Sequence, residues 1–276
     1  MSTGPSRSPS GAERTPVSVV IPCYRCKATL RRAIASVAGQ SARPAEVVLV
    51  DDGSDDSSLG LIREVQHEFG EAWVKVIALD ENRGAGAARN AGWNIATGRY
   101  VAFLDADDTW HPRKIEIQYS FMESNPGVAL CGHAHARIAD GEPADRPPKN
   151  RGHRAISRMQ LLLSNRFITP SVMLRRDLPQ RFLEGGRYME DHLLWLEIAS
   201  TGAQVARLNE PLAFIYKKPF GESGLSAHLF AMESAELGNY RLLRKKGAIG
   251  VATMLVLFGY SLAKFVRRLL IVRLGL

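Results

Sequence analysis

Cysteine is scarce in this sequence: three of 276 residues, an odd number without the spacing of a secreted disulfide framework. Reduced thiols are therefore expected. Cys23 and Cys26 have the C-x-x-C spacing of redox and zinc sites. A zinc ion would need a second ligand pair, and Cys131 with His133 and His135 offers only an irregular one. These last three residues alternate like side chains on one face of a strand, so a structural role is favoured for the thiols.

The N-terminus lacks the apolar segment that a signal peptide requires. Its sequence, MSTGPSRSPSGAERTP, is instead rich in serine, proline and glycine, a composition that favours disorder. We expect residues 1–15 to be disordered and the body of the protein to be cytoplasmic.

Acidic residues are absent from Arg241 onward, whereas the rest of the chain has 28 acids and 28 Lys or Arg residues. The tail contains eight cations, Arg241, Arg244, Lys245, Lys246, Lys264, Arg267, Arg268 and Arg273. A basic tail is typical of proteins that bind nucleic acid or an anionic membrane. The uncharged residues 247–263, GAIGVATMLVLFGYSLA, favour the membrane, so no nucleic-acid partner is expected.

The uncharged run has three structural interpretations. It is near the minimum length of a membrane-spanning helix, about 17 residues. It could instead lie in the membrane interface, with Lys264, Arg267 and Arg268 reaching lipid headgroups. The third interpretation is a C-terminal helix packed on the core. In the first two, residues 228–276 form a helical tail that holds the protein, peripherally or by a single pass, at the cytoplasmic face of the membrane.

From Val17 the sequence alternates between apolar, β-rich runs and helical stretches, the pattern of βα units around a mostly parallel sheet with helices on both faces. Strands are expected within residues 17–24, 45–56, 73–79, 100–110, 127–138, 169–176 and 206–218. Helices are expected within residues 26–40, 57–69, 82–98, 112–125, 155–165 and 185–202, and from about His228. The polar, proline-rich residues 139–154 predict a long loop.

Two of the predicted strands end in acids, Asp51 and Asp52 in one and Asp105, Asp107 and Asp108 in the other. Ligands of parallel α/β sheets bind at the carboxyl ends of the strands. We therefore expect both acidic clusters on the same edge of the sheet. Three carboxylates within four residues raise one another's pKa unless a cation neutralises them.

The segment Asp105-Ala106-Asp107 suits a divalent cation, because one or two carboxylates completed by phosphate oxygens are the usual ligands of magnesium. We expect Mn²⁺ or Mg²⁺ to be held by Asp105 and Asp107. The alternative is that Asp107 or Asp108 caps the helix that begins near Pro112. Capping would explain only one of the three acids.

Asp51 and Asp52 precede a glycine and a serine, so they form either an Asx turn or a group that accepts a hydrogen bond from a base or ribose. The later segment GAGAARNAG is not a dinucleotide-binding fingerprint, because Arg89 replaces the last glycine and the segment follows the third strand. Arg83 and Arg89, in a loop rich in backbone amides, suit a diphosphate instead.

Five motifs resemble, in order and spacing, the family 2 glycosyltransferases of the GT-A fold: VSVVIPCY, VVLVDDGSDD, NRGAGAARNAG, YVAFLDADD and MEDHLLW. Together they cover roughly residues 17–218, and five weak motifs in order are specific. The resemblance implies a Rossmann-like GT-A domain over residues 16–227, with a nucleotide-binding half at 16–110 and an acceptor half at 111–227.

The resemblance also implies roles for individual residues. Pro22 and Tyr24 would line the nucleobase pocket, Asp51 or Asp52 would bind the base, and the D-x-D pair would hold a divalent metal on the diphosphate. The expected nucleotide-sugar site comprises Pro22, Tyr24, Asp51, Asp52, Arg83, Arg89, Asp105, Ala106, Asp107 and Glu190.

Glu190 and Asp191 resemble the E-D motif of the family, whose aspartate is the general base. Sugar transfer requires a base to take the proton of the acceptor hydroxyl and a Lewis acid to stabilise the leaving diphosphate. With Asp191 opposite the metal, displacement is in line and the anomeric carbon is inverted. The alternative is that Asp191 is an acid favoured by the dipole at a helix N-terminus.

The sequence departs from the family pattern in one motif. Family members often carry Y-R-x-H, whereas here YKKPFGESGLS follows from Tyr216 and offers no metal-binding histidine, although Lys217 or Lys218 could contact phosphate. The Q-x-x-R-W motif of processive synthases is also missing, which favours transfer of one sugar.

The sequence thus predicts an inverting glycosyltransferase that moves one sugar from a nucleotide-diphosphate sugar, with a UDP-sugar favoured, to an acceptor hydroxyl. A lipid-linked saccharide in cell-surface glycan synthesis is the favoured acceptor, because the tail would place the site near lipid. Three alternatives are a nucleotidyltransferase, which also uses paired aspartates, a non-catalytic sugar-nucleotide-binding module, and a nucleic-acid binder that would explain only the tail.

Overall fold

The computed structural model describes residues 14–139, 151–216 and 229–274. The predicted disordered N-terminus, except for its last two residues, and most of the loop predicted at 139–154 lie outside these ranges. Within them the strands are β1 (Thr15–Cys23), β2 (Pro44–Asp51), β3 (Val74–Ala78), β4 (Tyr100–Phe103), β5 (Thr109–Trp110), β6 (Val128–Arg137), β7 (His153–Ala155), β8 (Met173–Arg175) and β9 (Gln204–Ile215). Thr15 therefore belongs to the first strand and not to a disordered segment.

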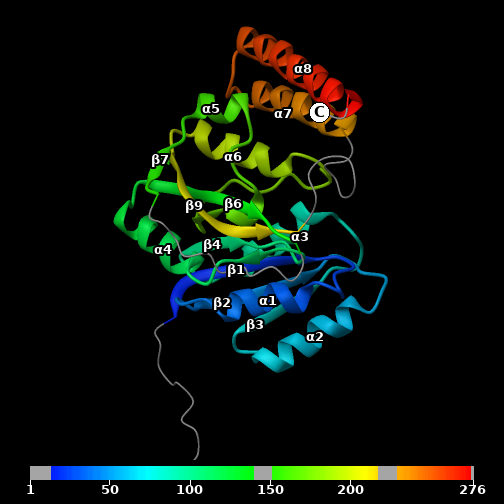
Figure 1. Cartoon of the computed structure of the whole chain (residues 1–276), viewed down its shortest axis with the longest axis vertical. Helices are drawn as coiled ribbons and strands as arrows, with labels where there is room; N and C mark the ends of the chain where they lie inside the picture. Colours follow the sequence, from blue (N-terminus) through cyan, green and yellow to red (C-terminus); the bar gives the residue numbers. More distant parts are fainter. Residues whose placement is uncertain (1–13, 140–150, 217–228, 275–276) are drawn as a thin grey trace, which may run out of the picture.

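All the described strands belong to one mixed sheet, with the order β3-β2-β1-β4-β8-β6-β9-β5 and with β7 paired to β9 (Figure 1). The first four strands run parallel, as expected for βα units. The second half makes the sheet mixed, because β8 runs antiparallel to both β4 and β6, and β5 and β7 run antiparallel to β9, whereas β6 and β9 pair in parallel. Helical crossovers impose parallel pairing, but the irregular connection that precedes β8 imposes no such direction.

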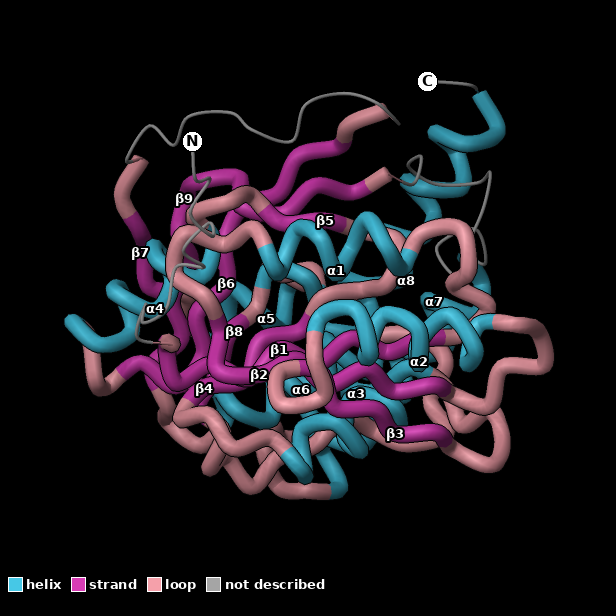
Figure 2. Tube along the Cα trace, turned by 90° about the horizontal axis from the view of Figure 1, so that it is seen from below, coloured by secondary structure: helices cyan, strands magenta, loops and turns pink. Residues whose placement is uncertain are grey.

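Helices cover both faces of the sheet. They are α1 (Leu30–Ala38), α2 (Ser58–Phe69), α3 (Ala85–Ile95), α4 (Lys114–Ser124), α5 (Arg158–Leu163), α6 (Glu190–Ser200), α7 (Leu229–Lys245) and α8 (Val251–Leu274). One hydrophobic cluster lies between the sheet and α1, α2 and α4, and a second lies between the sheet and α3, α5 and α6. Figure 2, seen from below, shows α1 and α2 on the near side of the sheet.

The sequence pattern explains how α1 and α3 pack. In α1, Leu30, Ala33, Ile34 and Val37 are buried at helical spacing, which gives the helix one apolar face. α3 lies so close to β1 and β2 that a Cβ at Gly92 would overlap a side chain of β1. A glycine here brings the start of α3 close to the carboxyl ends of the strands.

Two short elements replace longer predicted ones. The strand expected at 169–176 is a 3₁₀ turn, Thr169–Ser171, followed by β8. The described end of the predicted loop forms β7 against β9, and the strand predicted within 100–110 is divided into β4 and β5, which pair with different strands. These elements are held by pairing with distant strands, which local sequence patterns do not reveal.

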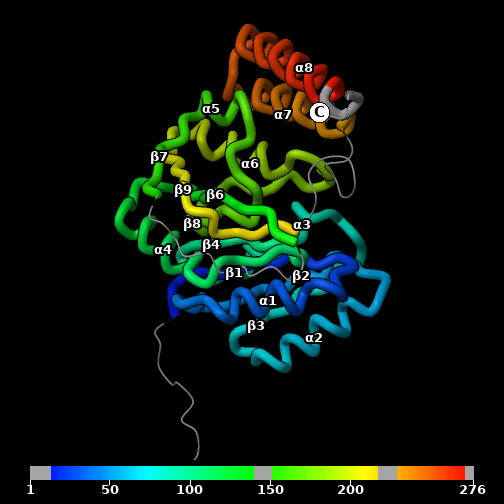
Figure 3. The backbone as a smooth tube through the Cα atoms, in the orientation of Figure 1, coloured from blue at the N-terminus to red at the C-terminus, as the bar shows by residue number. Residues whose placement is uncertain are grey.

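The C-terminal residues form a helical hairpin of α7 and α8 that packs beyond α6, at the top of Figures 1 and 3. No helix among the described residues is both long and apolar enough to cross a bilayer. Lys264 and Arg268 do not extend outward as the interfacial interpretation required. Lys264 pairs with Glu236 at 2.7 Å and Arg268 with Glu233 at 2.9 Å, both on α7.

A buried lysine in α4 gives a test of the core. The Lys114 side chain is fully buried with its Nζ 3.7 Å from the centroid of the Trp110 ring, and this nitrogen has no hydrogen-bond partner among the described residues. Burial lowers the pKa of Lys114 well below its ordinary value. Burial therefore favours the neutral amine in the folded state relative to the unfolded chain.

Replacing Lys114 with methionine is expected to raise the free energy of unfolding by about 1–3 kcal/mol at neutral pH, because the substitution removes an unsatisfied buried amine at similar volume. Because the folded pKa is lowered, the wild type gains stability as pH rises toward the ordinary lysine pKa, and the advantage of the variant should shrink. Urea unfolding of both proteins at several pH values measures this difference. A difference that does not change with pH would mean that Lys114 is charged in the folded state.

Candidate active site

The carboxyl ends of β1, β2 and β4 and the N-terminus of α6 surround two adjoining hollows. The first has a volume of about 500 Å³, and its lining includes eight of the predicted residues: Pro22, Tyr24, Asp52, Arg89, Asp105, Ala106, Asp107 and Glu190. The second, of about 370 Å³, contains Asp191. Asp105, Arg187 and Glu190 line both hollows, so the two adjoin at these side chains.

Pro22 and Tyr24 lie at the end of β1 and line the first hollow. Tyr24 is 43% exposed, and the guanidinium carbon of Arg25 lies 5.3 Å from the centroid of its ring. The neighbouring Cys23 and Cys26 are buried free thiols that also line this hollow. The charged residue at this end of the hollow is Arg25, which pairs with Asp55.

Asp52 organises the loop that closes the first hollow. Its Oδ1 accepts a hydrogen bond from the amide of Arg83 at 2.8 Å, and its Oδ2 accepts one from the amide of Gly84 at 2.9 Å. Asp51 is buried and accepts a hydrogen bond from the amide of Ser54, three residues later, at 3.3 Å. Of the two acids, only Asp52 is found among the described residues that line the hollow.

Arg89 is the buried cation of the acidic cluster. Its guanidinium donates to Asp105 Oδ1 at 2.7 Å and to Glu190 Oε1 at 3.2 Å. Burial acts to lower the pKa of Arg89, but the carboxylates of Asp105 and then Glu190 raise it above its ordinary value. The negative charge predicted at the end of β4 is therefore compensated in part by the protein itself.

Glu190 and Asp191 form the first turn of α6, where the helix dipole favours acids. Asp191 Oδ1 accepts a hydrogen bond from the amide of His192 at 2.6 Å, and Oδ2 accepts one from the Thr169 hydroxyl at 3.2 Å. The preceding residue, Met189, has a left-handed backbone with φ 57°, a conformation uncommon outside glycine and found at functional sites. The side-chain amide of Asn239 on α7 donates a hydrogen bond to the backbone carbonyl of Met189 at 2.9 Å.

Both acids at the start of α6 are stronger bases than ordinary carboxylates. Burial and then the charge of Asp191 raise the pKa of Glu190. Burial also raises the pKa of Asp191, although Arg89 and the His192 amide oppose the shift. A buried carboxylate with a raised pKa beside an open hollow is suited to accept a proton.

The predicted metal site has two carboxylates and no third protein ligand in the described part of the chain. Asp105 and Asp107 both line the first hollow, and Asp105 uses one oxygen to bind Arg89. Among the described residues no three His, Cys, Asp or Glu side chains are grouped so that they could hold a metal. Two carboxylates fit Mg²⁺ or Mn²⁺ when substrate phosphates complete the coordination.

Two arginines differ from the sequence-based expectation. The Arg83 side chain is not among the described residues of either hollow, because it pairs with Glu184 at 2.5 Å on the surface. Arg187 was not predicted, yet it lines both hollows. Its position three residues before Glu190 was the only feature of the sequence that could have indicated a place in the site. Lys217 and Lys218 lie outside the described residues.

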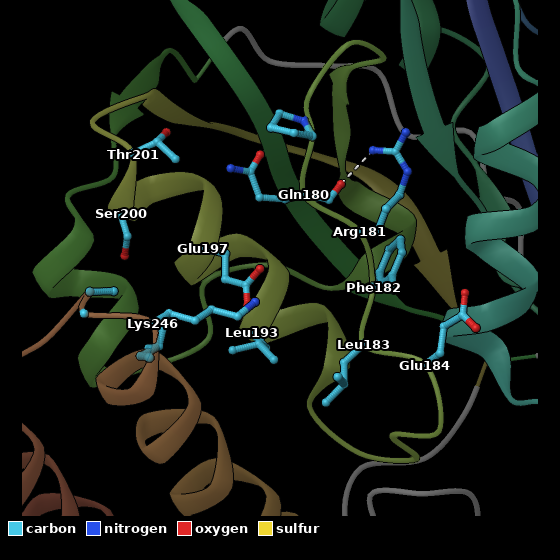
Figure 4. Close-up of a pocket in the computed structure, with 14 residues that line it drawn as sticks. Gln180, Arg181, Phe182, Leu183, Glu184, Leu193, Glu197, Ser200, Thr201 and Lys246 are labelled. Carbon is cyan, nitrogen blue, oxygen red and sulfur yellow. Dashed lines mark hydrogen bonds and ion pairs between the residues drawn. The ribbon is translucent and has the colours of Figure 1, made fainter.

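A larger hollow, of about 720 Å³, lies between α6 and the end of α7 (Figure 4). The side chains of Glu197 and Lys246 meet across it at 2.6 Å. None of the acids at the sheet edge is among its described lining residues. Its size alone therefore does not make it the better candidate for chemistry.

Comparison with known proteins identifies the family. Residues 18–182 match the model of glycosyl transferase family 2. The chain is 32% identical over 203 residues to the putative teichuronic acid biosynthesis glycosyltransferase TuaG of Bacillus subtilis, covering 71% of this chain and 77% of that protein. It is 29% identical over 198 residues to an Escherichia coli UDP-Glc:alpha-D-GlcNAc-diphosphoundecaprenol beta-1,3-glucosyltransferase, WfaP, covering 70% and 74%.

Solved structures share the fold at low identity. Residues 1–349 of S. aureus TarS in complex with UDP-GlcNAc superpose with a TM-score of 0.68 at 19% identity, covering 89% of this chain and 71% of that chain. The Pyrobaculum calidifontis mannosyltransferase PcManGT in complex with GDP-Man and Mn²⁺ has a TM-score of 0.65 at 16% identity, covering 90% and 69%. The fold is thus the α/β, GT-A-like fold that the sequence predicted, with a mixed sheet, and the chain belongs to glycosyl transferase family 2.

Proposed function

We propose that this glycosyltransferase moves a single sugar from a nucleotide-diphosphate sugar, with a UDP-sugar favoured, to an acceptor hydroxyl with inversion at the anomeric carbon. The observation that carries the proposal is the pair of adjoining hollows. One contains the strand-end residues suited to a nucleotide, the other contains Asp191, and they meet at Asp105, Arg187 and Glu190. Such an arrangement suits a donor and an acceptor that react where the hollows join.

In the proposed reaction Asp191 acts as the general base. Its carboxylate takes the proton of the acceptor hydroxyl while the hydroxyl oxygen forms a bond to the anomeric carbon and the bond to the nucleoside diphosphate breaks. The raised pKa of Asp191 makes it a better proton acceptor than an exposed aspartate. The Thr169 hydroxyl and the His192 amide hold the carboxylate in place. Attack from the second hollow on a donor in the first gives inversion.

Asp105 and Asp107 would hold a divalent metal, Mn²⁺ or Mg²⁺, which would stabilise negative charge on the diphosphate. Arg89 pairs with both Asp105 and Glu190 and holds their carboxylates in position. In this proposal Pro22 and Tyr24 contact the base, Asp52 binds the nucleoside and shapes the loop beside it, and Arg187 contacts phosphate. Arg83 would act through its backbone amide, because its side chain pairs with Glu184.

The proposed acceptor is a lipid-linked saccharide in cell-surface glycan synthesis, reached at the cytoplasmic face of a membrane. The support is the similarity to WfaP, whose name specifies a diphosphoundecaprenol-linked acceptor, and to TuaG of teichuronic acid synthesis. The rival of a nucleotidyltransferase is distinguished by its product. A nucleotidyltransferase releases pyrophosphate, whereas glycosyl transfer releases a nucleoside diphosphate.

A thermal-shift panel of nucleotide sugars, with and without Mn²⁺, tests the donor and the metal. One donor is expected to raise the Tm by mass action, with a larger rise when Mn²⁺ is present. The Asp107→Asn variant should keep the metal-free shift and lose the increment caused by Mn²⁺. Absence of stabilisation by every donor would contradict the proposal, and an increment that survives in Asp107→Asn would exclude this residue as a ligand.

A further inference from the structure

α8 has an apolar face that points away from the protein. The large side chains on this face are Val251, Leu255, Val256, Tyr260, Leu262, Val266 and Leu270. Val256 is 71% exposed and Leu255 59%, whereas Leu257 on the opposite face is 2% exposed. The exposed face extends over 20 residues, or about 30 Å of helix. A surface helix normally has the opposite orientation, with its apolar side chains toward the core.

Three polar side chains of α8, Ser261, Lys264 and Arg268, are paired with α7. The Ser261 hydroxyl donates to Glu233 at 2.8 Å, Lys264 donates to Glu236 at 2.7 Å, and Arg268 donates to Glu233 at 2.9 Å. These contacts fix the rotation of α8 about its axis, because turning the apolar face inward would leave both glutamates buried without the cations that neutralise them. The outward apolar face is therefore imposed by the ion pairs.

The exposed charges on this hairpin are of one sign. Within residues 229–270 the two acids, Glu233 and Glu236, are buried at 4% exposure. The exposed charged residues are Arg241, Arg244, Lys245, Lys246 and Arg267. An apolar face beside cations suits a surface that is hydrophobic below and anionic above, as a lipid leaflet is. A second copy of this hairpin would oppose cations to cations, so self-association is disfavoured.

The helical hairpin reaches the second hollow of the active site through α7. Met232 on α7 lines that hollow together with Asp191. Two residues earlier, Phe230 is 72% exposed and its ring meets the Phe265 ring of α8 edge to face at 5.0 Å. A saccharide bound near Asp191 could therefore remain attached to an acyl chain in a membrane that contacts α8.

We propose that the exposed face of α8 inserts among the acyl chains of one leaflet of an anionic membrane without crossing it. The choice of lipid as the partner rests in part on the proposed lipid-linked acceptor. Tyr260 and Arg267 lie on the same edge of this face, two helical turns apart. At this edge an aromatic ring and a guanidinium can reach the headgroups. The apolar insertion supplies most of the affinity, and the exposed cations supply the smaller, salt-sensitive part.

Flotation of the full chain with vesicles tests this surface. Phosphatidylcholine vesicles, with and without an anionic lipid, should both carry the wild type upward. The double variant Leu255→Gln/Val266→Gln should bind about a hundredfold more weakly to both. The matched variant Arg244→Gln/Lys245→Gln should bind about tenfold more weakly only to anionic vesicles. All four side chains are exposed, so equal Tm values verify that both variants fold.

Two results would overturn the proposal. One is that the wild type floats with neither kind of vesicle, and the other is that Leu255→Gln/Val266→Gln binds vesicles as tightly as the wild type. A dimer that this variant dissociates, with no vesicle binding, would assign the face to a second copy. Transfer to a water-soluble acceptor should be unchanged in the variant, whereas transfer to a lipid-linked acceptor in vesicles should fall. Vesicle binding without any transfer activity would refute the proposed function and leave this inference standing.

Discussion

Replacing Asp191 with asparagine is expected to lower kcat about a thousandfold, because the amide cannot accept the proton of the acceptor hydroxyl. Asn is nearly the same size and can keep the contact with Thr169, so the geometry should change little. Donor affinity should be retained, because Asp191 is not among the described residues of the first hollow. Release of nucleoside diphosphate measures kcat, and the Mn²⁺-dependent thermal shift measures donor binding.

Glu197→Gln is the matched control for this experiment. Glu197 is on the same helix but pairs with Lys246 in the larger hollow, away from the acids at the sheet edge. Its kcat should equal that of the wild type. If Asp191→Asn keeps more than about a tenth of the wild-type kcat, Asp191 is not the general base.

The same residue predicts the pH dependence of the reaction. The base must be ionised, and burial raises the pKa of Asp191 above its ordinary value. Activity should therefore be complete above this raised pKa and fall as pH decreases through it, at a higher pH than an exposed aspartate would cause. The residual rate of Asp191→Asn should lack this acidic limb. A limb that persists in the variant would belong to another group, with Glu190 the first candidate.

Replacing Arg89 with methionine is expected to lower the free energy of unfolding by about 3–5 kcal/mol, because breaking a buried ion pair leaves charges without compensation. Arg89 is 5% exposed and contacts both Asp105 and Glu190. The decrease in the free energy of unfolding should exceed the stabilisation that the two ion pairs contribute, since the carboxylates of Asp105 and Glu190 would then repel each other. Urea unfolding measures the change, and donor binding should weaken in parallel.

Two variants make the interpretation of Arg89→Met specific. Adding Glu190→Gln should recover part of the lost stability, because it removes one of the two opposed charges. Arg83→Met breaks the surface pair with Glu184, in which both side chains are about half exposed, and should cost less than about 1 kcal/mol. If Arg83→Met and Arg89→Met lower the free energy of unfolding equally, the buried position of Arg89 does not make its ion pairs more important for stability than a surface pair.

The sequence was sufficient to predict the N-terminal half of the sheet and the edge that bears the site. Apolar runs that alternate with amphipathic helices determine parallel βα units, and parallel strands bring their carboxyl ends to one edge. This is why Asp52 after β2 and Asp105 after β4 could be expected to meet before any coordinates were known. The strand β7 was not predicted, because its three residues are too few to show a period of their own. The separation of β5 from β4 and the short extent of β8 within predicted strands could not be read from the sequence either.

The partners of the charged side chains were decided only by the tertiary structure. Arg89 and Arg83 lie in one short segment and looked equally suited to a diphosphate, yet each pairs with a glutamate 101 residues away, Arg89 from the interior and Arg83 on the surface. On α8, Lys264 and Arg268 pair inward with Glu236 and Glu233. The sequence alone determined which residues are charged, which are apolar and how they repeat. Which charges neutralise one another depends on contacts between distant segments, and only the folded chain brings those segments together.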